Sequence, residues 1–298
     1  MTAPNLPSSD RLAALLDSAS IEISSRGYRL PELLENFRPG TEVTITFLPG
    51  DNGRHNVDAA SALRRVGFSP VPHLAAREMP SRQALDDFLA RLRGEADVSR
   101  VLLIAGDAAI ARGPFKSSRE LAASGLLEQH GIARVSVAGH PEGHPYLDQS
   151  GTFALLKAWQ DWGRASDVAV DIVTQFCFES PPILTWLGEL DARDLALPVI
   201  IGLAGPATAA TLTKFALRCG IGRSMRALRG QIGRYGRLLT DAAPDEVMRG
   251  LLSAPNQVTA SIAGFHLFPF GGLRKAASWL RADPEAALRS ARQVVSTV

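Results

Sequence analysis

The sequence predicts a single-domain α/β protein, a closed (β/α)8 barrel that spans residues 1–298. The first observation behind this prediction is the order of the elements, because short apolar strands alternate with helices eight times along the chain. The second is the length of 298 residues, which is typical of one such barrel. The third is that no glycine-rich dinucleotide fingerprint follows the first strand, which disfavours an open doubly wound sheet.

The expected strands are short and rich in β-branched and aliphatic residues. Polar and apolar residues alternate at 42–47, whereas 101–105 is a continuous apolar run, typical of a strand buried on both faces. The strands are expected at residues 20–24, 42–47, 69–74, 101–107, 135–139, 171–178, 198–205 and 261–268.

Helices are expected before the first strand and after each strand. Pro31 and the pair Pro181-Pro182 suit the first turn of a helix, and Ser81 is a typical N-cap. Elsewhere, apolar residues recur at helical spacing. The helices are expected in 1–19, 31–37, 57–66, 81–92, 118–129 and 152–162, from 181 onward, and in a segment that ends near Cys219.

Residues 222–255 are less regular than the rest of the chain. They are expected to form two or three helical segments, so that the barrel carries extra helices between its seventh and eighth strands. Five arginines, which most simply form a solvated helix face, fall here, at positions 223, 226, 229, 234 and 237.

The bulk composition argues against several classes of partner. The net charge of +2, with 46% hydrophobic and 21% charged residues, gives no reason to expect nucleic acid or an acidic membrane. No apolar run reaches the roughly 18–20 residues of a membrane span. Cys177 and Cys219 lack metal-ligand spacing and are expected to be buried, reduced thiols. Without a secretory signal, a cytoplasmic location is expected.

Polar residues stand where the expected strands end, and in a barrel these ends converge on one mouth. Apolar strands should not bury acids without a reason, which makes Glu22 and Asp107 the best acid–base candidates. The full set comprises Glu22, Thr46, His73, Asp107, His140, Glu142, His144, Gln175 and His266.

Other chemistries find less support. His140 and His144 are four residues apart, but Pro141 and Pro145 make a continuous helix between them unfavourable, so helical metal-ligand geometry is not expected. No Gly-x-Ser-x-Gly elbow and no Walker-type phosphate loop is present. The sequence therefore predicts no metal.

Five segments, in this order, carry a family resemblance. They are Pro-His-Leu at 72–74, Gly-Asp at 106–107, Ala-Gly-His-Pro-Glu-Gly-His-Pro at 138–145, Thr-Gln-Phe-Cys-Phe at 174–178 and Phe-His-Leu-Phe-Pro-Phe-Gly-Gly at 265–272. Together they resemble the methylenetetrahydrofolate reductase family, in its short bacterial form with a catalytic barrel only.

The resemblance implies an oxidoreductase of one-carbon metabolism. NAD(P)H would reduce FAD, and the flavin would pass the hydride to 5,10-methylenetetrahydrofolate to give 5-methyltetrahydrofolate, or the enzyme would run in the oxidative direction. Two alternatives remain: hydride transfer from NADH without flavin, and a barrel that binds folate or flavin without turnover. A homo-oligomer is left open.

The resemblance also assigns roles to residues. Glu22 matches the acid that protonates the folate, Asp107 the aspartate beside flavin and pterin, and Gln175 the glutamine that contacts pterin. Phe268 and Phe270 match positions that line the substrate space. The positions that match cofactor contacts are Thr46, His73, Gly106, Asp107, His140, His144 and Lys157. Ala105 stands where the family commonly has arginine, which removes one expected FAD contact.

Overall fold

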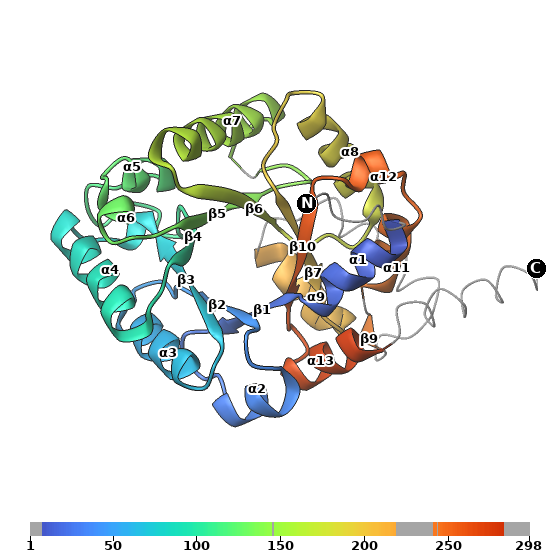
Figure 1. The fold of residues 1–298 in the computed structure, drawn as a ribbon, viewed down its shortest axis with the longest axis horizontal. Helices are drawn as coiled ribbons and strands as arrows, with labels where there is room; N and C mark the ends of the chain where they lie inside the picture. The colour runs from blue at the N-terminus through green and yellow to red at the C-terminus, as the bar shows by residue number, and fades with distance from the viewer. Residues whose placement is uncertain (1–7, 145, 219–240, 243, 283–298) are drawn as a thin grey trace, which may run out of the picture. The chain divides into compact units, whose positions relative to one another are not determined.

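A computed structural model describes residues 8–144, 146–218, 241–242 and 244–282. In this part of the chain eight parallel strands form a closed barrel in the order β1-β10-β7-β6-β5-β4-β3-β2, which confirms the predicted (β/α)8 fold (Figure 1). The strands are β1 (Ser20–Ser24), β2 (Glu42–Thr46), β3 (Ser69–Ala75), β4 (Arg100–Ile104), β5 (Arg134–Gly139), β6 (Ala169–Thr174), β7 (Val199–Ala204) and β10 (Ile262–Phe268).

The helices separate these strands, as the apolar spacing predicts. They are α1 (Ser8–Asp17), α2 (Leu30–Asn36), α3 (Arg54–Arg65), η1 (Ala76–Glu78), α4 (Arg82–Ala96), α5 (Ser118–Ala122), α6 (Leu126–Gln129), α7 (Gln149–Ser166), α8 (Ser180–Asp191), α9 (Ala209–Arg218), α11 (Asp245–Leu252), α12 (Asn256–Thr259) and α13 (Leu273–Arg281). Helix α11 is one of the helical segments predicted in residues 222–255, between β7 and β10; residues 219–240 lie outside the described part of the chain, so the number of such segments stays a prediction.

The chain forms two compact units. One consists of Ser20–Gly139 and Phe153–Val173, and the other of Met1–Ala19, His140–Thr152 and Thr174–Val298. We call them the 20–139 unit and the 174–298 unit and describe each by itself. The expectation of a single domain stays a prediction.

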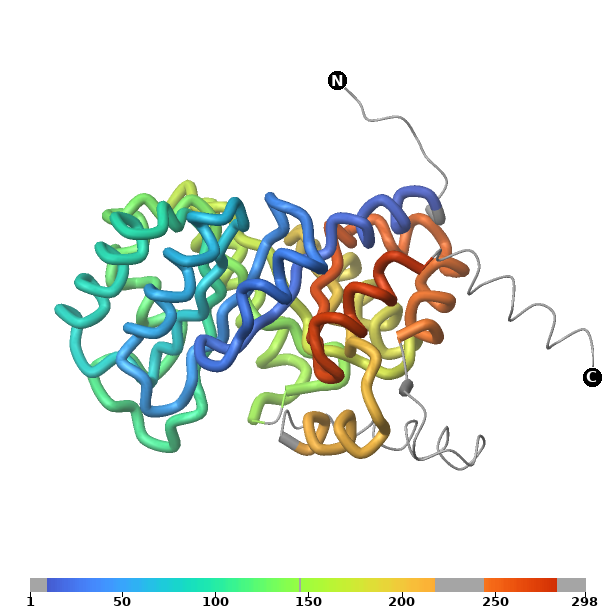
Figure 2. The backbone as a smooth tube through the Cα atoms, turned by 90° about the horizontal axis from the view of Figure 1, so that it is seen from below, coloured from blue at the N-terminus to red at the C-terminus, as the bar shows by residue number. Residues whose placement is uncertain are grey.

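The 20–139 unit contains β1 to β5 and nearly all of β6. Glu22 pairs in register with Thr44, and Ile45 pairs with Pro72, so β1, β2 and β3 are neighbours. Helix α4 begins as predicted, because Ser81 accepts a hydrogen bond from the Ala84 N–H at 3.0 Å. Helices α3 and α4 pack against each other, and both views show them side by side (Figures 1 and 2).

The 174–298 unit contains β7, β10 and the helices around them. Pro181 and Pro182 lie in the first turn of α8, as predicted. Helix α1 packs against β10, α11 and α13, and Figure 2 shows the dark blue α1 beside these orange and red segments. A short antiparallel pair, β8 (Ala207–Thr208) with β9 (Asp241–Ala242), was not predicted.

Several predicted boundaries are wrong. The helix expected at 118–129 is two helices, separated at Gly125, and α7 is longer than 152–162 at both ends. Strand β4 ends at Ile104 rather than at 107, and β6 ends at Thr174 rather than at 178. The predictions for Pro145, for Cys219 and for arginines 223, 226, 229, 234 and 237 lie outside the described residues.

Candidate functional site

Glu22 on β1 and His73 on β3 face each other in the 20–139 unit. The Glu22 Oε2 and His73 Nε2 atoms are 3.6 Å apart, and the two side chains are only 20% and 10% exposed. The flanking Ile21 and Ile23 are buried. Successive side chains of a strand point to opposite faces of the sheet. Glu22 therefore lies on the face of β1 opposite Ile21 and Ile23.

Burial sets the charge of both groups. It raises the pKa of Glu22 to about 8, because a carboxylate loses its hydration when it is removed from water. It lowers the pKa of His73 to about 4, because the imidazolium is disfavoured for the same reason. Near neutral pH the pair therefore consists of a protonated carboxyl group and a neutral imidazole.

Thr46 lies on β2, next to β1, with Ser24 as its register partner. Its Oγ1 atom is buried and has no hydrogen-bond partner in the described part of the chain, and the same is true of His73 Nε2. Buried polar atoms normally have a partner. The structure therefore brings together Glu22, Thr46 and His73 on three neighbouring strands, with two polar atoms that an incoming group could satisfy.

Asp107 lies in the loop after β4, and its side chain is exposed. The argument that an apolar strand buries this acid is therefore wrong, because the strand ends three residues earlier. The preceding Gly106 has φ +89°, and a Cβ atom there would also approach the Ala75 Cβ to 3.2 Å. A glycine thus allows the loop to turn tightly beside the end of β3.

In the 174–298 unit, the rings of His140 and His144 meet edge to face with their centroids 4.6 Å apart. The N–H groups of Tyr146 and Leu147 both donate to His144 Nδ1 at 3.1 Å, so the neutral ring carries its proton on Nε2. Burial lowers the pKa of His140 to about 4, with a smaller contribution from His144. Burial also lowers the pKa of His144.

Glu142 of the same loop interacts with Cys177, which sequence reasoning did not pair with it. Burial raises the pKa of the Cys177 thiol, and the charge of Glu142 and a hydrogen bond to its carboxylate raise it further. A thiol that resists ionisation is a poor nucleophile, which agrees with the predicted buried, reduced cysteine. In the part of the chain that the structure describes, no group of three or more His, Cys, Asp or Glu residues could hold a metal ion.

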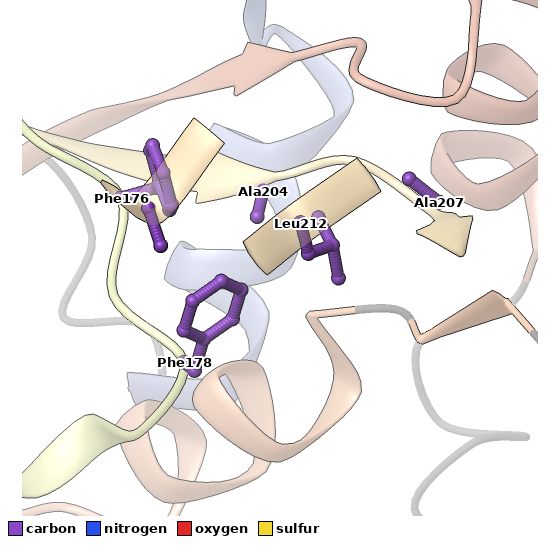
Figure 3. Close-up of a cluster of buried hydrophobic side chains, with 6 residues drawn as sticks. Phe176, Phe178, Ala204, Ala207 and Leu212 are labelled. Carbon is purple, nitrogen blue, oxygen red and sulfur yellow. The ribbon is translucent and has the colours of Figure 1, made fainter. Parts of the chain in front are cut away.

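Aromatic rings gather around the ends of β6 and β10. Figure 3 shows Phe176 and Phe178 on the segment after β6, in a buried cluster with Ala204, Ala207 and Leu212. Three partly buried rings, which include two predicted substrate contacts, pack against this cluster: Phe215, Phe268 and Phe270.

These three rings form a stack. Phe215 of α9 and Phe270 stack with their centroids 4.2 Å apart and an interplanar angle of 19°. Phe268 and Phe270 are nearly parallel at 5.7 Å. The predicted pterin contact Gln175 directly precedes Phe176 in the chain. Sequence reasoning did not single out Phe215, because its apolar position in a helix is indistinguishable from ordinary core.

Lys157, a predicted cofactor contact, lies on α7. Its ammonium group forms an ion pair with Asp161, one turn further along the same helix, and both side chains are about half exposed. The arrangement is that of an ordinary i,i+4 pair on a solvated helix face.

A polar network inside the 20–139 unit was also missed. Arg100 on β4 contacts both Glu42 carboxylate oxygens, at 2.6 and 2.5 Å, and Asp171 Oδ2 at 3.0 Å. It also donates to Ser136 Oγ at 3.1 Å. These residues stand near the beginning of four strands, β2, β4, β5 and β6, and their position at strand starts was a signal available in the sequence.

Fold and site define the chain as a (β/α)8 barrel with buried ionisable side chains on its strands. No protein-family model matches the sequence. Within the described residues, none of the helices has the length and apolar character to cross a membrane.

Among solved structures, the chain is similar to an uncharacterized protein from Clostridium thermocellum that binds two copies of 5-methyl-5,6,7,8-tetrahydrofolic acid. The TM-score is 0.56 at 9% identity, covering 93% of this chain and 99% of that one. The chain also matches a sugar phosphate isomerase/epimerase from Parabacteroides distasonis. The TM-score is 0.43 at 12% identity, covering 89% of this chain and 97% of that one. At such identities the first likeness shows the barrel fold alone.

Proposed function

We propose that this chain binds a reduced folate and acts as a methylenetetrahydrofolate reductase. The single observation that carries the proposal is Glu22, a carboxyl group that burial keeps protonated near neutral pH. A general acid needs a pKa near the working pH, and a pKa of about 8 meets that need. The fold shared with a protein that binds 5-methyltetrahydrofolic acid supports the folate as ligand.

Glu22 would act at the first step on 5,10-methylenetetrahydrofolate. Its proton passes to a bridging amine nitrogen, the C–N bond breaks with its electron pair going to that nitrogen, and an iminium carbon remains. This carbon accepts a hydride that originates from NAD(P)H, giving 5-methyltetrahydrofolate. Run in reverse, Glu22 would take the proton back.

Other side chains would hold the substrate. The exposed Asp107 carboxylate can accept hydrogen bonds from the amino edge of a pterin, and the Gln175 amide offers both a donor and an acceptor. Phe268 and Phe270 present aromatic rings against which a flat ring can pack.

FAD remains part of the proposal as the cofactor that would relay the hydride between nicotinamide and folate. The residues fit its ring end, because the buried Thr46 Oγ1 atom has no partner in the described chain and could hydrogen-bond to a flavin. The resemblance also assigns to this cofactor His140 and His144, two partly buried rings of the 174–298 unit, and that assignment stays a prediction. The pyrophosphate end fits less well, because Lys157 is already paired with Asp161 and Ala105 carries no charge.

The test is a pair of anaerobic half-reactions with the purified protein. We expect a flavin spectrum that NADH or NADPH bleaches and that methylenetetrahydrofolate restores. Glu22→Gln should leave bleaching unchanged and reduce the folate step by at least about 100-fold, since an amide cannot donate the proton. Glu35→Gln, an exposed position on α2, is the matched control and should behave as the wild type.

Three results discriminate the alternatives. A colourless protein that still reduces methylenetetrahydrofolate with NADH would favour direct hydride transfer without flavin. Binding of 5-methyltetrahydrofolate in calorimetry without any turnover would favour a binding protein. Full folate turnover in Glu22→Gln would remove Glu22 as the proton donor.

A further inference from the structure

His73 Nε2 is a buried polar atom without a hydrogen-bond partner in the described part of the chain. The resemblance places His73 among the cofactor contacts, yet its Nε2 atom lies 3.6 Å from Glu22 Oε2. That separation is a few tenths of an ångström beyond a hydrogen bond. A small side-chain rotation would therefore bring the two groups into contact.

The surroundings of the pair contain few other charges. The neighbouring strands β2 and β4 present uncharged residues on the same face at this level, namely Thr44, Thr46, Leu102 and Ile104. Strand β10, the other neighbour of β1 in the barrel order, carries one ionisable residue, the buried His266. Towards the strand starts, Glu42 and Arg100 share that face, but they are bound to each other. In the described part of the 20–139 unit, His73 is thus the basic side chain that lies beside Glu22, at 3.6 Å.

A general acid that gives up its proton leaves a carboxylate behind. In a buried place this anion is costly unless a donor hydrogen-bonds to it, and charge-assisted hydrogen bonds are the strong ones. A neutral imidazole with its proton on Nε2 is such a donor.

We propose that His73 is a positioning residue for Glu22: its Nε2–H group orients the carboxyl group and hydrogen-bonds to the carboxylate that remains after proton donation. The proposal rests on the proposed role of Glu22 as proton donor. In this role His73 acts on the proton donor, whereas the resemblance assigns it to the cofactor contacts. No proton leaves the imidazole, so the step stays balanced, with one proton passing from Glu22 to the folate.

The test measures Glu22 in the ligand-free protein, so that it does not depend on turnover. With glutamate labelled at the side-chain carboxyl carbon, NMR follows the titration of Glu22, whose signal is identified by its loss in Glu22→Gln. Removing the donor in His73→Leu should destabilise the carboxylate and raise the titration midpoint by about one unit, a tenfold weaker acid. His73→Gln, whose amide N–H can take the place of Nε2–H, should stay within about half a unit of the wild type.

His130→Leu is the matched control, because His130 directly follows α6 and contacts Asp86 on α4, not a strand residue. It should leave the Glu22 midpoint unchanged. Equal shifts in His73→Leu and His73→Gln, or no shift in either, would overturn the proposal. If the midpoints move as expected but no folate is turned over, the proposed function fails and the role of His73 toward Glu22 stands.

Discussion

Glu22 is a carboxyl group whose burial opposes folding at alkaline pH. Its pKa is about 8 in the folded protein against an ordinary value of 4.5, so folding between these values takes up a proton. By linkage, the contribution of Glu22 to stability is highest below about pH 4.5, falls as the pH rises toward 8, and is level above that.

We therefore predict that Glu22→Gln stabilises the protein at pH 8.5 by a few kcal/mol, on the order of 3, and has little effect at pH 5. The amide has no charge to desolvate. Urea unfolding at both pH values measures the difference. Glu35→Gln on the surface should show no such pH dependence, and an equal effect of Glu22→Gln at both pH values would contradict the prediction.

The sequence predicted Glu22 and Asp107 from the same argument, and the two outcomes differ for a physical reason. Glu22 stands in the middle of a strand, between the buried residues Ile21 and Ile23, so its side chain is held away from solvent. Asp107 follows the strand, where a glycine turns the chain outward. An apolar run in the sequence does not show at which residue the strand leaves the sheet. The exposure of Asp107 therefore could not be predicted from the sequence. Its role in pterin binding stays a prediction.

The helix predicted at 118–129 is broken because of backbone conformation at a single residue. Gly125, two residues beyond the C-cap of α5, has φ +73°, a left-handed conformation that interrupts the helical path and forms the N-cap of α6. The apolar side chains on both sides, Leu121, Leu126 and Leu127, remain buried, so their spacing looked like one helix. Hydrophobic spacing therefore predicted the buried face correctly and missed the break.

Gly125→Ala should destabilise the protein by about 1–2 kcal/mol, because alanine pays the steric cost of the left-handed conformation. Nothing lies within 4 Å of a Cβ atom at Gly125, so the effect is one of backbone conformation.

Gly94 provides the matched control for that change. It lies within α4, and a Cβ atom there also meets nothing within 4 Å. Gly94→Ala should stabilise the protein by about 0.5–1 kcal/mol, because alanine favours the helix. Thermal or urea unfolding separates the two variants, and effects of the same sign would refute this account of the break.

At the scale of the whole barrel, the order of the strands was predictable and the pairing of their interior side chains was not. Eight alternating strands and helices define the sequence of elements. Which interior residues meet depends on the register between strands, and local sequence does not encode it. The contacts Glu22–His73 and Arg100–Asp171 each join strands separated by a further strand, and neither pair is close in sequence.

The Arg100 network joins four strands of the 20–139 unit. The Arg100 and Asp171 side chains are only 13% and 7% exposed, and Glu42 is 39% exposed. Burial raises the pKa of Asp171, which the positive charge of Arg100 opposes. The guanidinium therefore compensates a buried carboxylate, and its removal leaves that charge without a partner.

Arg100→Met should destabilise the protein at pH 8 by about 3–5 kcal/mol. The loss should be smaller at pH 5, because without Arg100 the pKa of Asp171 rises further and the protonated acid needs no cation. The double variant Arg100→Met with Asp171→Asn should recover part of the loss, because it removes the unpaired charge. Urea unfolding of both variants at the two pH values tests this, with Arg93→Met on the exposed face of α4 as control. If the double variant were as unstable as Arg100→Met at both pH values, packing of the arginine stem, and not charge compensation, would be what holds these strands.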